Sequence, residues 1–215
     1  SASDSNTLVA LTSLTAIKDA LDSTNASSRT LPFIDADGNG GISPGDTLKY
    51  MVVITNGVSD AYDVLYNDSP GANTALVVGS VACDTCTVVQ GNTAGDTAVN
   101  VRIDSIAANS SATIYYAVTV NNPLPFQLSR LTNQGYVASS NASSIATADP
   151  ATAEAGDATV VMLTMGAIRG FAWVDDGDGS KEAGEPGIPE VAVTLYYSGP
   201  NNLALQTSTN TDAAG

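Results

Sequence analysis

Apolar and polar residues alternate along several short stretches of the chain. Residues 48–55, 100–104, 113–120 and 191–197 all show this two-residue period. Successive side chains of a strand point to opposite faces of a sheet, so this period predicts half-buried strands. The positions expected to face inward are Leu48, Tyr50, Val52, Ile54, Val101, Ile103, Ile114, Tyr116, Val118, Val120, Val191, Val193, Leu195 and Tyr197.

Turn-forming residues separate these stretches, as at Asn56-Gly57 and at 121–123. Many short strands joined by such turns predict an all-β fold built as a β-sandwich. Residues 7–21 contain good helix formers, but they also contain a strand-like Leu-Val-Ala-Leu and lack clear caps, so we expect a strand there. A loop or linker is expected at 146–157, which is rich in Ala, Thr and Asp, and a different pattern begins at Gly166.

The composition narrows the functional classes. The 215 residues are 43% hydrophobic, enough to bury a core, and 22 acidic against 7 basic residues give a net charge of −15. That charge disfavours nucleic acid and anionic membrane surfaces as partners and suits divalent cations. The absence of histidine removes the commonest general base and most zinc sites. No pair of carboxylates stands out as a glycosidase site, so we do not expect an enzyme.

Residues 35–46 read DADGNGGISPGD, which matches the spacing of an EF-hand-type calcium loop. Oxygen ligands are expected at alternate positions of this loop, on either side of a glycine turn. The predicted ligands are Asp35, Asp37, Asn39, Gly41 through its carbonyl, Ser43 and Asp46. The last position carries Asp46 in place of the usual Glu, which weakens the site or admits a water. An acidic turn without metal is the alternative.

The two cysteines form the motif Cys83-Asp84-Thr85-Cys86. A redox pair with this spacing normally opens a helix, whereas the flanking residues here predict strands. A zinc site would need two more soft ligands. We therefore predict a Cys83–Cys86 disulfide that staples a turn in an exported protein and closes too short a loop to stabilise it strongly.

Two segments resemble known families of surface domains. From about Ala16 to Leu163, including "DADGNGGISPGDTLKYMVVITN", "YDVLYNDSP" and "LTNQGYVASSN", the chain resembles the conserved-repeat Ig-like domain of large bacterial and archaeal surface proteins (the domain of unknown function 11 family). This resemblance implies a Greek-key β-sandwich used as a spacer or assembly module outside the cell. The expected organisation is an N-terminal extension or donor strand over residues 1–15, followed by this sandwich over 16–165.

Residues 166–215 resemble the B-type repeat domain of serine–aspartate-repeat adhesins, relatives of collagen-adhesin stalk domains, through "GAIRGFAWVDDGDGSKEAGEPGIPEVAVTLYYSGP". This resemblance implies a second, smaller β-sandwich that binds calcium, here without its closing strand. Its acidic loop is one residue shorter than the family pattern, so a plain acidic turn is the alternative. The expected ligands are Asp175, which replaces Val174 at the first position, together with Asp176, Asp178 and Glu185.

Related surface domains often carry an amide bond between a lysine and an asparagine, promoted by a buried carboxylate. The resemblance places the candidates at Lys18, Asp68 and Asn133. The chemistry requires a desolvated, uncharged amine. The alternative is an exposed lysine with an Asp and an Asn in turns. Arg169 occupies the corresponding strand of the second unit, so we expect no such bond there.

These observations predict an extracellular, calcium-stabilised structural protein, a subunit of a cell-surface fibre, sheath or stalk. Its partners would be other copies of itself or neighbouring surface domains. One form of assembly is strand complementation, in which residues 7–11 add to the open edge of the second sandwich of another copy. The alternative is an adhesin for a host or matrix ligand, which would require an exposed aromatic patch; Tyr115, Tyr136 and Tyr197 are scattered along the sequence and expected to be packed.

Overall fold

The structure is a computed structural model, and it describes residues 12–21, 34–125, 127–164, 170–199 and 202–214. The chain divides into two compact units, Ser1–Met165 and Gly166–Gly215. In the described residues no helix is long and apolar enough to cross a membrane.

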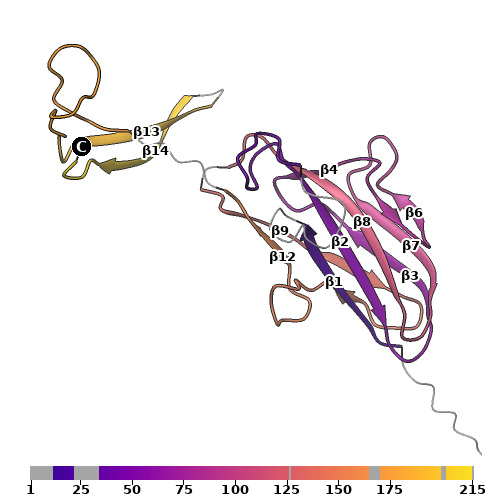
Figure 1. Cartoon of the computed structure of the whole chain (residues 1–215). Coiled ribbons are helices and arrows are strands. Elements are labelled where there is room, and N and C mark those ends of the chain that lie inside the picture. The colour runs from indigo at the N-terminus through magenta and orange to yellow at the C-terminus, as the bar shows by residue number, and fades with distance from the viewer. Residues whose placement is uncertain (1–11, 22–33, 126, 165–169, 200–201, 215) are drawn as a thin grey trace, which may run out of the picture. The chain divides into compact units, whose positions relative to one another are not determined.

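The first unit is a β-sandwich of antiparallel sheets, as the alternating pattern predicted (Figure 1). One sheet has the order β1-β2-β8-β4, with β5 also paired to β8, and the other has the order β11-β10-β3-β7-β6. The first sheet contains β1 (Leu14–Leu21), β2 (Thr47–Asn56), β8 (Ser111–Val120), β4 (Thr74–Leu76) and β5 (Ala82–Cys83). The second contains β11 (Ile145–Ala146), β10 (Gly135–Ala138), β3 (Ala61–Asp68), β7 (Val99–Ile106) and β6 (Thr87–Gln90).

The core of this unit lies between the two sheets. The inward positions predicted on β2, β7 and β8 are all buried, with exposures of 0–2%. Their outward neighbours are half-buried or exposed, except Ala117, which is also buried. Because side chains alternate across a strand, this pattern fixes the register in which β2 pairs with β1 and β8.

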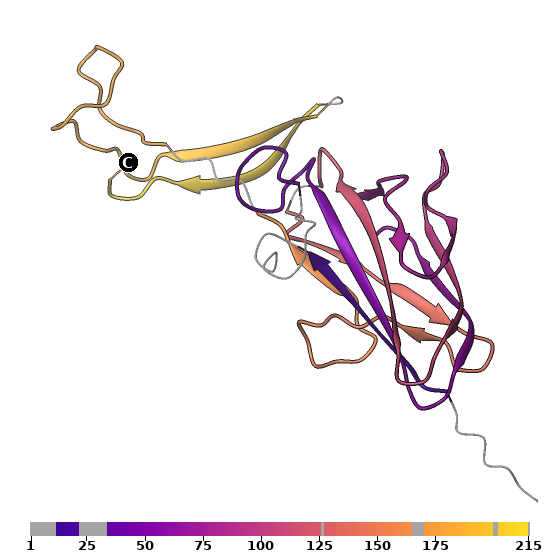
Figure 2. The same cartoon turned by 45° about the vertical axis from the view of Figure 1, so that its right-hand side comes forward.

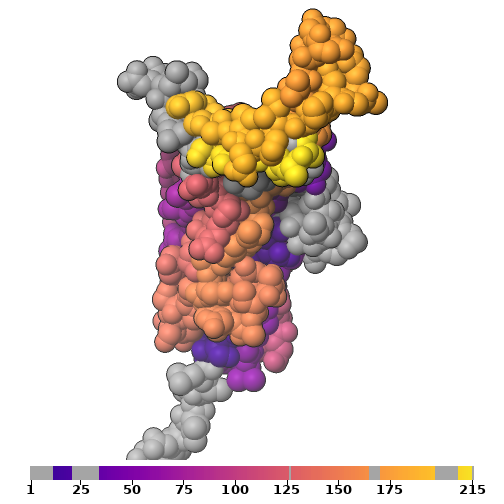
Figure 3. All heavy atoms as spheres, turned by 90° about the vertical axis from the view of Figure 1, so that its left-hand side faces the viewer, coloured from indigo at the N-terminus to yellow at the C-terminus, as the bar shows by residue number. Residues whose placement is uncertain are grey.

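A third, two-stranded sheet of β9 (Arg130–Asn133) and β12 (Thr159–Met162) adjoins β1. The Lys18 amide donates a hydrogen bond of 2.9 Å to the Ala148 carbonyl, and the Thr159 hydroxyl donates one of 2.7 Å to the Lys18 carbonyl. Since β2 pairs with the other edge, strand β1 is held on both edges. In Figure 3 this part of the chain, coloured salmon to orange, forms the near face of the unit. The strand begins at Leu14, inside the range predicted as an extension, while residues 7–11 lie outside the described residues.

The cysteine motif connects the two sheets. Cys83 ends β5 of the first sheet and Cys86 directly precedes β6 of the second, and the two form a disulfide with Cα atoms 5.9 Å apart. The predicted stapled turn is therefore the crossover between the layers of the sandwich.

In the second unit, β13 (Ala192–Gly199) and β14 (Asn202–Asn210) form an antiparallel hairpin (Figure 2). The prediction that Val193 and Leu195 are half-buried inward positions is wrong, because they are 49% and 40% exposed. Strand propensity was enough to form the hairpin, but the described part of this unit contains no second sheet against which its apolar side chains pack.

Candidate crosslink site and acidic loops

Lys18 is fully buried in the core of the first unit, so the alternative of an exposed lysine is wrong. It lies on β1, and its Nζ is 2.5 Å from Oδ2 of Asp68, at the end of β3. The rings of Tyr50 and Tyr116 pack beside the ammonium group, with centroids 4.5 and 5.6 Å from Nζ. Ring faces attract cations, so the lysine is surrounded by groups that partly replace its water.

Asp68 is the centre of this cluster. Its Oδ2 accepts hydrogen bonds from three donors: Lys18 Nζ, the Tyr66 hydroxyl at 2.7 Å and the Tyr116 hydroxyl at 2.8 Å. Its Oδ1 is buried and has no hydrogen-bond partner. A buried acceptor without a donor is costly, so a hydrogen bond from a reacting group to this oxygen would be favourable.

Asn133 completes the cluster from the end of β9 and is 4% exposed. Its Nδ2 donates a hydrogen bond of 3.2 Å to the Tyr116 hydroxyl, while its Oδ1 is buried without a partner. The three residues proposed from sequence thus meet through Tyr116, although they come from β1, β3 and β9. Asp68 and Asn133 are strand-terminal residues buried in the core, and not exposed turn residues.

The electrostatics of the cluster favour a reactive amine. Burial lowers the pKa of Lys18 to about 8, and the neighbouring Asp68 carboxylate opposes that shift. Burial also raises the pKa of the Tyr66 and Tyr116 hydroxyls well above their usual range, with Asp68 contributing, so both stay protonated. Burial likewise raises the pKa of Tyr50, and its interaction with Asn133 opposes this. A lysine with a lowered pKa supplies the uncharged nucleophile that amide formation needs.

Sequence reasoning placed Tyr50 and Tyr116 on inward positions but assigned them no role at the site, and it missed Tyr66. The available signal was chemical: three tyrosines on core strands must each find a partner for a buried hydroxyl. Gly135 makes room for one of them, since a Cβ there would lie 2.5 Å from the Tyr66 hydroxyl.

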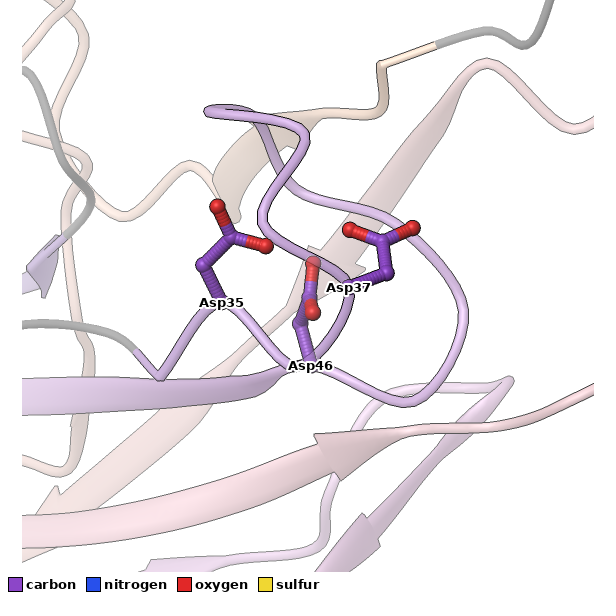
Figure 4. A group of neighbouring side chains, drawn as sticks. All are labelled: Asp35, Asp37 and Asp46. Carbon is purple, nitrogen blue, oxygen red and sulfur yellow. The ribbon is translucent and has the colours of Figure 1, made fainter.

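The first acidic loop precedes β2 and is closed by a two-residue bridge between Ile34 and Thr47. Asp35, Asp37 and Asp46 each place a carboxylate oxygen within 4.8 Å of the others (Figure 4). Asp46 is buried, accepting hydrogen bonds from the amides of Ala36 and Ser43. Backbone amides, Gly40 first, lower the pKa of Asp35, so this carboxylate is ionised and suited to a cation.

The remaining predicted ligands line the same loop. Asn39 donates to Asp37 and accepts from the Gly41 amide, and the Ser43 hydroxyl donates to Asp46 and Asp37. Hard oxygen donors in this number are the set that calcium takes. Gly41 is required by packing, since a Cβ would overlap Thr164 Oγ1 at 1.7 Å. The loop therefore contacts the segment that follows β12.

The second acidic loop, in the second unit, gathers two overlapping groups of carboxylates. One consists of Asp175, Asp176 and Glu185, and the other of Asp176, Asp178 and Glu182. Asp175 joins the cluster, whereas Val174 is an exposed apolar residue. Sequence reasoning missed Glu182, which stands outside the ligand spacing. All these carboxylates are exposed or half-exposed.

Of the aromatic residues considered for an adhesive surface, Tyr115 and Tyr136 lie on different sheets of the first unit, on β8 and β10. Tyr136 is 55% exposed, contrary to the expectation that it is packed, whereas Tyr115 is half-buried. The side chain of Tyr197 lies outside the described residues. Tyr62, which is 49% exposed, lies on β3 at the end away from Tyr136.

Comparisons with known proteins give weak structural likenesses only. No protein-family model and no curated protein matches the chain. Among solved structures, the major pilin subunit BcpA of Bacillus cereus is 9% identical, with a TM-score of 0.46 over 92% of this chain and 55% of that chain. The major pilin SpaA of Corynebacterium diphtheriae is 14% identical, with a TM-score of 0.42 over 69% of this chain and 37% of that chain.

The collagen-binding subdomain of the Enterococcus faecalis surface protein ACE is 12% identical, with a TM-score of 0.40 over 68% of this chain and 95% of that one. This chain thus covers little more than half of the first pilin and less than half of the second. At these scores the likenesses carry no argument about function, which rests on the geometry described above.

Proposed function

We propose that the chain is a structural module of an extracellular fibre, sheath or stalk, and that a Lys18–Asn133 amide bond locks its first unit. The observation that carries the proposal is the burial of Lys18, Asp68 and Asn133 in one cluster, with a lysine of lowered pKa beside a carboxylate. An unlinked buried lysine is costly, and a permanent bond is useful chiefly to a protein that must resist extension or proteolysis.

The reaction is an amide exchange that needs no external reagent. Lys18 passes one proton to Asp68, and its neutral Nζ attacks Cγ of Asn133. The Nζ–Cγ bond forms and the Cγ–Nδ2 bond breaks, so Nδ2 departs as ammonia. The proton that Asp68 took first goes on to Nδ2 and supplies the third hydrogen of ammonia. The second proton released by Nζ ends on Asp68, which is neutral in the product. A protonated Asp68 also offers an O–H donor for the carbonyl oxygen of Asn133, which has no partner before reaction.

The position of this bond suits a protein under tension. It would join β1, the first described strand, to β9, and so enclose residues 19–132 with most strands of both sheets. A disulfide at the sheet crossover and a strongly acidic surface fit an exported protein.

Intact mass measured under denaturing conditions tests the crosslink. The wild-type chain is expected to weigh about 17 Da less than its sequence, the mass of ammonia, beyond the hydrogens lost to the disulfide. Lys18→Ala and Asn133→Ala remove the deficit, whereas Lys49→Ala, which removes another lysine of the same unit, keeps it. A wild-type chain of full sequence mass would end the proposal.

The proposal includes calcium at the first acidic loop, held by Asp35, Asp37 and Asp46 with help from Asn39, Ser43 and the Gly41 carbonyl. The second loop offers Asp175, Asp176, Asp178 and Glu185. Bound calcium would neutralise carboxylates that otherwise repel one another, and so order the loops.

Assembly by strand complementation is the sharper form of this function. The hairpin of the second unit exposes Val193, Leu195 and Tyr196, and the donor would be residues 7–11 of another copy. Negative-stain microscopy of native material with calcium, and then with chelator, is expected to show filaments that loosen on chelation. Deleting residues 1–11 abolishes them. Isolated particles in all conditions would favour a stalk module or an adhesin.

A further inference from the structure

The Tyr116 hydroxyl contacts both ends of the reaction. It donates to Asp68 Oδ2 at 2.8 Å and accepts from Asn133 Nδ2 at 3.2 Å. Among the hydrogen bonds of the described residues, no other side chain joins these two groups. We propose that Tyr116 is a catalytic residue of the crosslinking reaction and carries a proton from Asp68 to the departing nitrogen of Asn133. This inference rests on the proposed amide bond.

The departing nitrogen needs an acid because an amide anion is too basic to leave. Before attack, Nδ2 is a planar amide nitrogen and donates to the tyrosine oxygen. After attack by Nζ, Cγ is tetrahedral and Nδ2 becomes an amine with a lone pair, which can accept a proton. The same contact then runs in the opposite direction, with the Tyr116 hydroxyl as donor.

The proton balance closes within the cluster. Asp68 first takes a proton from Lys18 and becomes neutral. Tyr116 gives its hydroxyl proton to Nδ2 and takes the Asp68 proton through the existing hydrogen bond, so Tyr116 ends unchanged and Asp68 is again ionised. Ammonia leaves as the Cγ–Nδ2 bond breaks. Asp68 then accepts the remaining proton of Nζ, which gives the neutral amide and a neutral carboxyl group.

Tyr66 provides a matched comparison. Like Tyr116, it is fully buried and donates to Oδ2 of Asp68, at 2.7 Å, but it has no hydrogen bond to Asn133. Removing either hydroxyl takes one donor from the same carboxylate oxygen. Only the Tyr116 change also breaks the connection to the leaving group.

The test measures the rate of crosslinking in the full chain. Chains are made by cell-free synthesis, translation is stopped, and samples are quenched in acid at intervals and weighed. Tyr116→Phe is expected to slow the loss of ammonia at least about tenfold, because general acids contribute factors of about a hundred or more. Tyr66→Phe stays within about threefold of wild type. Resistance to limited proteolysis, followed in parallel, shows that each variant has folded before its rate is compared.

Equal slowing by the two substitutions would mean that both tyrosines only hold Asp68 in place. No slowing by either would show that the proton takes another route. Each result overturns the proposed proton relay through Tyr116. A wild-type chain that never loses ammonia refutes the proposed bond itself, which is a separate outcome. Incorporating 3,5-difluorotyrosine covers the case in which a phenylalanine variant does not fold, since it keeps the ring and a more acidic hydroxyl. At position 116 it should change the rate and at position 66 it should not, and equal rates contradict the relay.

Discussion

Burying Lys18 costs free energy that its surroundings offset only in part. A lysine taken from water needs a paired charge or must lose its own. Asp68 and the rings of Tyr50 and Tyr116 supply attraction, yet the pKa of Lys18 is still lowered to about 8. An amide bond removes the charge on the nitrogen and leaves Asp68 neutral. The Lys18–Asp68 pair would then hold no ion, which is a thermodynamic reason for the reaction to proceed.

The lowered pKa predicts how stability depends on pH when the bond cannot form. In Asn133→Ala, the folded lysine loses its proton near pH 8 and the unfolded one near 10.5. Between these two pH values the unfolded state binds more protons than the folded state, so the free energy of unfolding rises with pH. Below about pH 8 the lysine is protonated in both states and contributes no pH dependence. Between pH 8 and 10, the free energy of unfolding of Asn133→Ala is expected to rise by about 2 kcal/mol more than that of the double variant Lys18→Met/Asn133→Ala. Denaturant unfolding measures both. A difference between the two variants that does not change with pH would show that the lysine is not desolvated.

Gly135 is expected to be sensitive to any side chain. In Gly135→Ala the new methyl group would lie 2.5 Å from the Tyr66 hydroxyl, deep in the core. The ring or the strand must shift, at a cost of about 1–3 kcal/mol in unfolding free energy. Gly170→Ala is the control, because no atom lies within 4 Å of the added carbon. Equal stability of the two variants would contradict the packing around Tyr66.

Among the elements, the first acidic loop is attached at three places. The Ile34–Thr47 bridge closes its base, Asp46 is buried within it, and the Thr164 amide donates to the Ile42 carbonyl at 2.7 Å. An ion bound here would therefore stabilise β2 together with the segment after β12, and not only an isolated turn.

Calcium is expected to raise the melting temperature of the first unit in proportion to the logarithm of its concentration above Kd. Asp37→Asn removes a carboxylate from the loop and should abolish most of the shift. Asp84→Asn, an exposed carboxylate outside both loops, should leave it unchanged. The measurement is a thermal melt in chelator and in increasing calcium. A wild-type melting temperature that never moves would rule out the calcium site.

For the molecule as a whole, the amide bond would determine how the chain responds to force. Tension applied at the ends of the first unit would pass from β1 to β9 through the Lys18–Asn133 bond, so residues 19–132 would carry none of it. Because the site is buried, the bond would be protected from solvent.

Single-molecule stretching of the chain should therefore show no extension from residues 19–132. In Lys18→Ala the same experiment should release an additional contour length of about 40 nm, since an extended residue spans about 3.5 Å. The Lys49→Ala variant serves as the control and should stretch like wild type. A wild-type trace with the full additional length would contradict a closed bond.

The sequence by itself determined the elements and their faces. The two-residue period at 48–55 and 113–120 predicted which side chains enter the core, because alternation across a strand is a local property of the backbone. The spacing of 35–46 predicted which oxygens share a loop, since those residues are neighbours in the chain. The same local reasoning misjudged Val193 and Leu195, whose burial depends on a covering layer that a strand pattern does not encode.

Only the tertiary structure decided what surrounds Lys18. Its partners lie 50 residues away at Asp68 and farther still at Asn133. They come together because β1, β3 and β9, which belong to three different sheets, lie around one core. The sequence reasoning named these three through a resemblance, without any local signal for their contact. For the tyrosines that link them, Tyr66 and Tyr116, the sequence signalled only that a buried hydroxyl needs a partner. Which partner each hydroxyl finds is set by the distances between the strands.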